Sequence, residues 1–111
     1  MVSSLVIKEL QLRAARSPKR EVCGLVDSAG TTYPITNVAG PAHHFIMDKR
    51  EYAIACNTIK KIGRTIAYCY HSHLNGDASP SDADRRAQAS TGLPYLIIAA
   101  NSIYWLESSY A

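Results

Sequence analysis

Apolar residues recur at helical spacing in two segments of the chain. The first covers residues 2–16 and stops at Pro18, because a proline disfavours helical geometry in the residue before it. The second covers residues 48–61, where Asp48 and Glu51 match the pattern of a capping box. Two amphipathic helices are therefore predicted. Their apolar positions are Leu5, Val6, Leu10 and residues 12–15 in the first, and Tyr52, Ala55, Ile59 and Ile62 in the second.

Short runs rich in apolar, β-branched and aromatic residues lie between and after these helices. Turns that contain glycine or asparagine separate several of them, which indicates strands joined by hairpins. The order of elements predicts an α/β domain of the mixed α+β kind, with one curved mixed β-sheet flanked by helices. The predicted extended segments cover residues 21–27, 32–37, 44–47, 65–70, 95–100 and 102–106.

The strand at residues 65–70 leads directly into His71-Ser72-His73. Successive strand side chains point to opposite faces, so His71 and His73 would present their imidazoles side by side on one face. Two protonated imidazoles would repel each other there, whereas two neutral ones can share one metal ion. The pattern predicts a metal site at the C-terminal end of this strand.

A third helix is predicted just beyond the two histidines. Ser79 can cap it, Pro80 suits its first position, and Asp82 can complete a capping box. Asp84 then lies in the first turns, and a helix docked across the strand end could bring its carboxylate to both imidazoles. Two nitrogens and one oxygen, with a fourth position left for water, describe a catalytic zinc site. Structural zinc sites usually hold four ligands and favour cysteine, and the chain contains no Cys-x-x-Cys pair.

Glu21 is the predicted general base. It begins the apolar run at residues 21–27, where a strand could direct its carboxylate toward the metal. Zinc lowers the pKa of water to roughly 7, and a nearby carboxylate can accept the proton and pass it to a leaving amine. Taken alone, Glu21 also fits a solvated charge in an ordinary polar turn after Pro18.

Six residues spread over the chain match the pattern of a known family. That pattern is a glutamate, then His-Ser/Thr-His, seven residues, a serine, two residues and an aspartate, and it belongs to the JAMM (also MPN-plus or JAB) metallopeptidases. The chain resembles this family over most of its length, and its segments 19–25, 44–53 and 91–95 look most like the JAMM domain of phage tail-assembly proteins. The matching residues are Glu21, His71, Ser72, His73, Ser81 and Asp84.

The resemblance implies a JAMM or cytidine-deaminase-like architecture with one catalytic zinc ion. The implied reaction is hydrolysis of a peptide or isopeptide bond, in phage tail assembly or in a prokaryotic ubiquitin-like pathway. The implied partners are a peptide or protein substrate, including a ubiquitin-like protein or phage tail proteins. The implied metal ligands are His71, His73 and Asp84, and the implied catalytic residues are Glu21, as the base, and Ser81, as the oxyanion donor.

The chain departs from the family in two ways. Leu74 stands where the family commonly has a proline after the second histidine. The long insertions with which eukaryotic deubiquitinating members grip ubiquitin are also missing, so the chain offers no support for specific recognition of ubiquitin itself. The identity of the substrate therefore stays open.

Several candidates have a second interpretation. Ser81 and Asp84 also match a bare capping box, which would carry no catalytic meaning. Asp77 could compete with Asp84 for the metal, although turn preference explains it equally well. His43 and His44 are adjacent, and adjacent strand residues face opposite sides, so we interpret them as surface or strand-entry residues.

The three cysteines are odd in number and lack metal-type spacing, which favours free thiols in a reducing compartment. Cys23 would share a strand face with Glu21, and Cys69 with His71, so a cysteine–histidine hydrolase is an alternative. The apolar flanks of both cysteines disfavour it, because a nucleophilic thiolate needs an electropositive, accessible setting.

Length, composition and charge constrain the partners and the compartment. With 111 residues and 47% hydrophobic content, the chain is expected to form one domain over residues 1–111. No apolar run approaches the roughly 20 residues that cross a bilayer, and no signal-peptide core is present. We therefore expect a soluble, cytoplasmic protein without a membrane partner, or a virion-associated one if it derives from a phage. A net charge of +3, spread over several segments, disfavours a nucleic-acid partner.

Two rival functions are left open. A tail-assembly or binding module could keep the metal site for structure, with little or no turnover. A DNA-associated protein, like the related RadC group, would bind DNA in a salt-dependent way, which the mild basicity disfavours.

Overall fold

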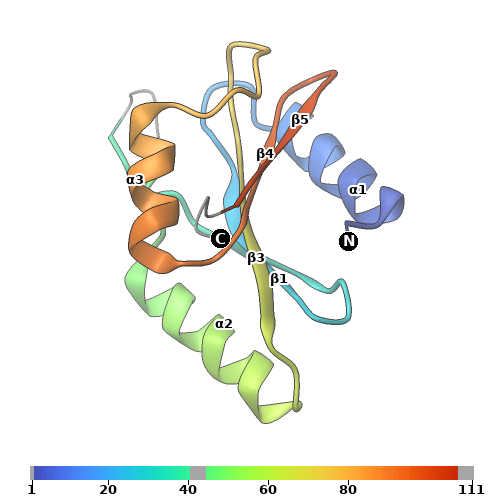
Figure 1. Ribbon diagram of the computed structural model, residues 1–111, viewed down its shortest axis with the longest axis vertical. Coiled ribbons are helices and arrows are strands. Elements are labelled where there is room, and N and C mark those ends of the chain that lie inside the picture. The colour runs from blue at the N-terminus through green and yellow to red at the C-terminus, as the bar shows by residue number, and fades with distance from the viewer. Residues whose placement is uncertain (1, 41–44, 108–111) are drawn as a thin grey trace.

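The computed structural model describes residues 2–40 and 45–107, which form one mixed sheet with helices on both faces (Figure 1). The elements are α1 (Ser4–Ala15), β1 (Cys23–Asp27), β2 (Thr32–Ile35), α2 (Lys49–Lys61), β3 (Ile66–Ser72), α3 (Asp82–Thr91), β4 (Tyr95–Ile98) and β5 (Ile103–Leu106). The sheet order is β2-β1-β3-β4-β5, in which β3 and β4 run parallel and all other neighbours antiparallel. The predicted mixed sheet flanked by helices is confirmed.

Helix α1 covers one face of the sheet, and α2 and α3 lie on the other (Figure 1). Strand β3 runs through the middle and divides its side chains between the two faces, as the two-residue period of a strand requires. Tyr68 and Tyr70 pack with Leu10 of α1, whereas Cys69 packs with Ile59 of α2. The core therefore has two layers, and β3 contributes to both.

Helix α2 begins where it was predicted to begin, but its cap differs from the prediction. Asp48 accepts a hydrogen bond from the Glu51 N–H at 2.9 Å. The Glu51 carboxylate does not complete a capping box; it accepts bonds from the N–H and the hydroxyl of Thr36. This contact ties α2 to the end of β2. Within residues 2–40 and 45–107, no helix has the length and apolar character needed to cross a membrane.

Helix α3 begins later than predicted. Ser79 is not its cap, because the helix starts at Asp82 and Ser81 is its N-cap. The Ser81 hydroxyl oxygen accepts a bond from the Asp84 N–H at 3.1 Å, and the Asp84 carboxylate accepts one from the Ser81 N–H at 2.9 Å. This reciprocal pair satisfies two backbone N–H groups, which a single cap at Ser79 would not do. The helix then connects β3 to its parallel neighbour β4.

Gly24 lies at a point of very close packing in β1. A Cβ atom at this position would lie 2.3 Å from the Tyr33 carbonyl oxygen and 2.6 Å from the Tyr70 hydroxyl oxygen. A guanidinium N–H of Arg13 in α1 donates to that hydroxyl at 3.2 Å and so helps to hold the ring over the glycine. The absence of a side chain therefore lets β1 lie against both neighbours.

Replacing Gly24 with alanine is expected to lower the free energy of unfolding by roughly 1–3 kcal/mol, the usual cost of extra volume in a packed core. The new methyl group would meet a backbone oxygen, which cannot rotate away. Gly40→Ala is the matched control, because no atom of the described residues lies within 4 Å of a Cβ placed there. Urea unfolding measures both variants, and equal midpoints would contradict the close packing.

Candidate metal centre

The two histidines of the motif lie where strand β3 ends. His71 is the penultimate residue of β3 and pairs with Cys23 of β1 and Ile97 of β4. His73 follows the strand, and its N–H continues the pairing by donating to the Ile98 carbonyl at 2.8 Å. The two ring centroids are 5.2 Å apart. The predicted placement of both imidazoles together at a strand end is confirmed.

Asp84 brings a carboxylate from helix α3 to these rings. Its Oδ1 lies 2.9 Å from Nε2 of His71, and its Oδ2 lies 2.9 Å from Nε2 of His73. Oδ2 also accepts the Ser81 N–H bond of the capping box. The capping and metal-binding interpretations of Asp84 are therefore compatible, because the capping box itself turns the carboxylate toward the histidines. One ligand atom from each of the three residues lies within 4.8 Å of the others.

The hydrogen bonds of the two imidazoles fit a bound cation. A carbonyl oxygen can only accept, so Nδ1 of His73 donates to the Asp77 carbonyl at 2.8 Å, and Nε2 faces the Asp84 carboxylate. His71 is 0% exposed, and although its Nε2 lies 2.9 Å from Oδ1 of Asp84, neither of its ring nitrogens has the geometry of a hydrogen bond to any described residue. Such an arrangement is costly unless a positive charge lies between these groups. Two imidazoles and one carboxylate are a ligand set that catalytic zinc ions use.

The ionisable groups of the centre shift one another's pKa. Burial alone would raise the pKa of Asp84, but the contacts with His71 and His73 outweigh it and hold that pKa far below its usual range. The contact with Asp84 raises the pKa of His73, whereas burial lowers the pKa of His71. Asp84 is therefore ionised and His71 neutral, which are the forms in which these side chains bind metals.

Glu21 lies beside this group, two residues before β1, which starts at Cys23 and not at Glu21 as predicted. Glu21 is buried, and it shares a polar cavity of about 210 Å³ with His73 and Ser81. Burial raises the pKa of the Glu21 carboxyl to about 7, with a smaller lowering by His73 and a smaller raising by Asp84. A carboxyl group with a near-neutral pKa is suited to proton transfer. The other residues that line this polar cavity are Leu74, Asn75, Asp77 and Ser79.

Ser72 has a role that the sequence analysis missed. Its hydroxyl oxygen accepts a bond from the Val22 N–H at 2.9 Å, and its own N–H donates to the Val22 carbonyl at 3.0 Å. These two bonds extend the pairing of β1 with β3 by one residue, which brings the backbone of Glu21 next to the histidines. The sequence held one indication of this role, because Ser72 lies between the two metal ligands on a buried strand.

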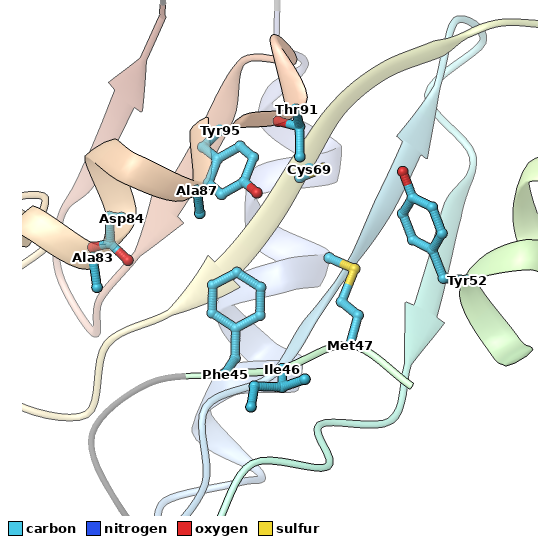
Figure 2. A pocket seen from close by; sticks show the side chains of 10 residues that line it. All are labelled: Phe45, Ile46, Met47, Tyr52, Cys69, Ala83, Asp84, Ala87, Thr91 and Tyr95. Carbon is cyan, nitrogen blue, oxygen red and sulfur yellow. The ribbon is translucent and has the colours of Figure 1, made fainter. Parts of the chain in front are cut away.

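A second cavity, of about 330 Å³, is apolar and shares Asp84 with the centre (Figure 2). Residues 45–47 form one wall, in which the Phe45 ring points toward Tyr95 and stacks on His71 with the centroids 4.4 Å apart. The sequence analysis missed this apolar cavity, because its walls come from segments that are distant in the chain. The remaining lining residues are Tyr52, Cys69, Ala83, Asp84, Ala87, Thr91 and Tyr95.

The surroundings of the cysteines contradict the cysteine–histidine alternative. Cys23 and Cys69 are buried free thiols. Burial raises the pKa of each thiol to about 12, so neither is a thiolate near neutral pH. A thiol in that state is a poor nucleophile.

Asp77 is not one of the three residues of the metal-binding group. Asp77 supports His73 through its backbone carbonyl, while its carboxylate accepts a bond from the Ser79 N–H at 2.9 Å. This agrees with the turn interpretation of Asp77. His43 and His44 lie outside the described residues.

Comparisons with known proteins identify a family and a relative that this chain matches. The family model described as prokaryotic homologs of the JAB domain matches residues 4–108. Desampylase of Haloferax volcanii is 35% identical over 91 residues, which cover 76% of this chain and 66% of that protein. The family model therefore spans nearly the whole of this chain, whereas the relative matches over part of each sequence.

Two solved structures resemble this fold. A protein of Desulfitobacterium hafniense, determined in solution, matches with a TM-score of 0.77 and 25% identity, covering 96% of this chain and 84% of that one. A protein of Salinibacter ruber matches with a TM-score of 0.66 and 18% identity, covering 97% and 81%. At its lower identity, the second likeness supports the fold alone. Because the family model spans residues 4–108 and agrees with the JAMM resemblance of the motif, this chain belongs to the prokaryotic JAB domain family.

Proposed function

We propose that the chain is a zinc-dependent isopeptidase that releases ubiquitin-like proteins from their conjugates. The observation that carries this proposal is the convergence of His71, His73 and Asp84 beside a polar cavity that contains Glu21. The Haloferax volcanii relative supports the substrate class, because its name, desampylase, refers to the removal of a ubiquitin-like protein. The match covers 66% of that relative, and the substrate of this chain is therefore proposed by similarity.

The proposed roles follow from the position of each side chain. His71, His73 and Asp84 would hold one zinc ion, which when bound supplies Lewis-acid chemistry by polarising a carbonyl group and lowering the pKa of water. Glu21, in its ionised form, takes a proton from the attacking water. It then returns this proton to the leaving amine, which makes the departure of the amine favourable.

Ser81 is proposed as the donor to the developing oxyanion. Its oxygen accepts the Asp84 N–H bond, so a lone pair caps the helix and the hydroxyl proton is left for another acceptor. The side chain of Ser81 also lines the polar cavity that contains Glu21. The same residue can therefore serve the helix and the reaction.

The other functions considered from the sequence gain less support. A binding module would explain the metal ligands, but it gives no reason for the buried carboxyl group of Glu21, whose desolvation is costly. The phage tail setting stays a prediction, because neither the family description nor the named relatives refer to it.

Asp84→Asn is expected to weaken zinc binding more than about 100-fold. Loss of a residue that only hydrogen-bonds to a metal ligand typically costs up to about 100-fold, and Asp84 is proposed as a ligand itself. The amide keeps an oxygen for the Ser81 N–H but loses the negative charge. Asp82→Asn is the matched control, because Asp82 lies exposed in the same helical turn. Competition with a chelator measures both affinities. Equal affinities would show that Asp84 is a cap and not a ligand.

Glu21→Gln is expected to lower kcat by about 10²–10⁴-fold, the usual contribution of a general base. The amide keeps the shape of the side chain but cannot take up a proton. Zinc content and melting temperature should stay near those of the wild type. Glu107→Gln, at an exposed position, serves as the control. Hydrolysis of a ubiquitin-like protein linked to a lysine peptide is the assay, and an undiminished rate would remove the catalytic role.

Ser81→Gly is expected to lower kcat by about 10²–10³-fold, as the loss of one oxyanion donor does elsewhere. Glycine is a suitable replacement because it weakens a helix N-cap by only a few tenths of a kcal/mol. Ser81→Thr should restore most of the rate, since it restores the hydroxyl. If kcat falls only in proportion to the melting temperature in both variants, Ser81 acts as a helix cap alone.

A further inference from the structure

One side chain connects the polar cavity with a wall of the apolar cavity. Asn37 lies just beyond β2, where an isolated bridge pairs it with Met47. Its Nδ2 donates to the carbonyl oxygen of Glu21 at 3.0 Å. Its Oδ1 accepts from the N–H of Ala39 at 2.9 Å and from the N–H of Ile46 at 3.1 Å. A single amide therefore bonds to the backbone of three residues.

These partners determine the orientation of the Asn37 amide. Oδ1 uses both of its lone pairs on N–H donors, and Nδ2 uses one of its protons on a carbonyl oxygen. The reverse orientation would set amide protons against the N–H groups of Ala39 and Ile46. An aspartate here could only accept, and an alanine could do neither, so the position requires both abilities of an amide.

The backbone of Glu21 is held on both sides. On one side, Arg20 donates from Nη2 to the carbonyl oxygens of Asn37 at 2.6 Å and Ala39 at 2.8 Å. On the other side, the neighbouring residue Val22 is bonded to Ser72 of β3. Glu21 therefore lies between the strand that carries the histidines and the segment that carries Asn37.

The same amide also holds the wall of the apolar cavity. Ile46 belongs to the 45–47 wall, which Figure 2 shows facing Tyr95 across the cavity. Phe45, in the same wall, stacks on His71. A shift of the Ile46 backbone would thus change the position of this wall relative to both Glu21 and the metal ligands.

We propose that Asn37 is a positioning residue that fixes the distance between Glu21 and the 45–47 wall, so that a substrate held against this wall presents its scissile bond to the base. The inference rests on the proposed function, because it takes Glu21 as the base. Asn37 acts through backbone groups and does not itself transfer a proton.

Two substitutions separate the bonds that Asn37 makes. Asn37→Asp keeps both acceptor bonds but sets a carboxylate against the Glu21 carbonyl, so kcat should fall about 10- to 100-fold with KM little changed, as for small misplacements of a catalytic group. Asn37→Ala loses all three bonds, so KM should rise as well. Asn57→Asp, exposed on α2, makes the same chemical change and should leave both constants unchanged. The zinc-loaded proteins are assayed on the lysine-linked ubiquitin-like conjugate.

A purely structural role for Asn37 makes a different prediction. It would lower the melting temperature and leave kcat and KM of the folded, zinc-loaded molecules at their wild-type values. That result, or equal kcat for Asn37→Asp and Asn57→Asp, would overturn the proposal.

Amide hydrogen exchange tests the same link without a substrate. The Ile46 N–H should exchange faster in Asn37→Ala than in the wild type, and at the wild-type rate in Asn37→Asp. Unchanged exchange in Asn37→Ala would overturn the proposal. Failure of the proposed function would show elsewhere, as a Glu21→Gln variant that keeps the wild-type rate.

Discussion

The carboxylate of Asp84 is shared by the groups that meet at the metal centre. Its two oxygens face one imidazole each, and Oδ2 also accepts the N–H of Ser81. A buried negative charge is costly unless it is compensated; the Ser81 N–H provides part of the compensation, and a cation held between the carboxylate and the two rings would provide the rest. The docking of α3 on the end of β3, and with it one side of the polar cavity, depends on this charge.

Local periodicity was sufficient for the parts of the centre that lie on one element. Histidines at positions 71 and 73 share a strand face because side-chain alternation is a property of the extended backbone itself. The start of α3 was harder to predict, because Ser79 before Pro80 satisfies local rules for a helix start. The contacts of Asp84 with both imidazoles add to the reciprocal cap at Ser81, and local sequence rules do not include contacts between distant segments.

The features that could not be predicted depend on contacts between distant segments. Glu21 reaches the histidines because the register of β1 on β3 pairs Cys23 with His71, and no local pattern specifies that register. Asn37 follows a strand, where an asparagine ordinarily indicates a turn. Its bonds to Glu21 and Ile46 exist only once three segments have come together. The apolar cavity has the same origin, since α2, α3 and the 45–47 wall enclose it jointly.

Strands β3 and β4 run parallel, so the chain has to return across the sheet between them, and α3 is part of that return. An ion held by His71, His73 and Asp84 would therefore join the first turn of α3 to the end of β3. Strands β4 and β5 come after this link in the chain. Zinc would then act on folding as well as on chemistry. The free energy of its binding would also stabilise the packing of β4 and β5 on the rest of the sheet, so the assembly of these two strands would be coupled to the supply of metal.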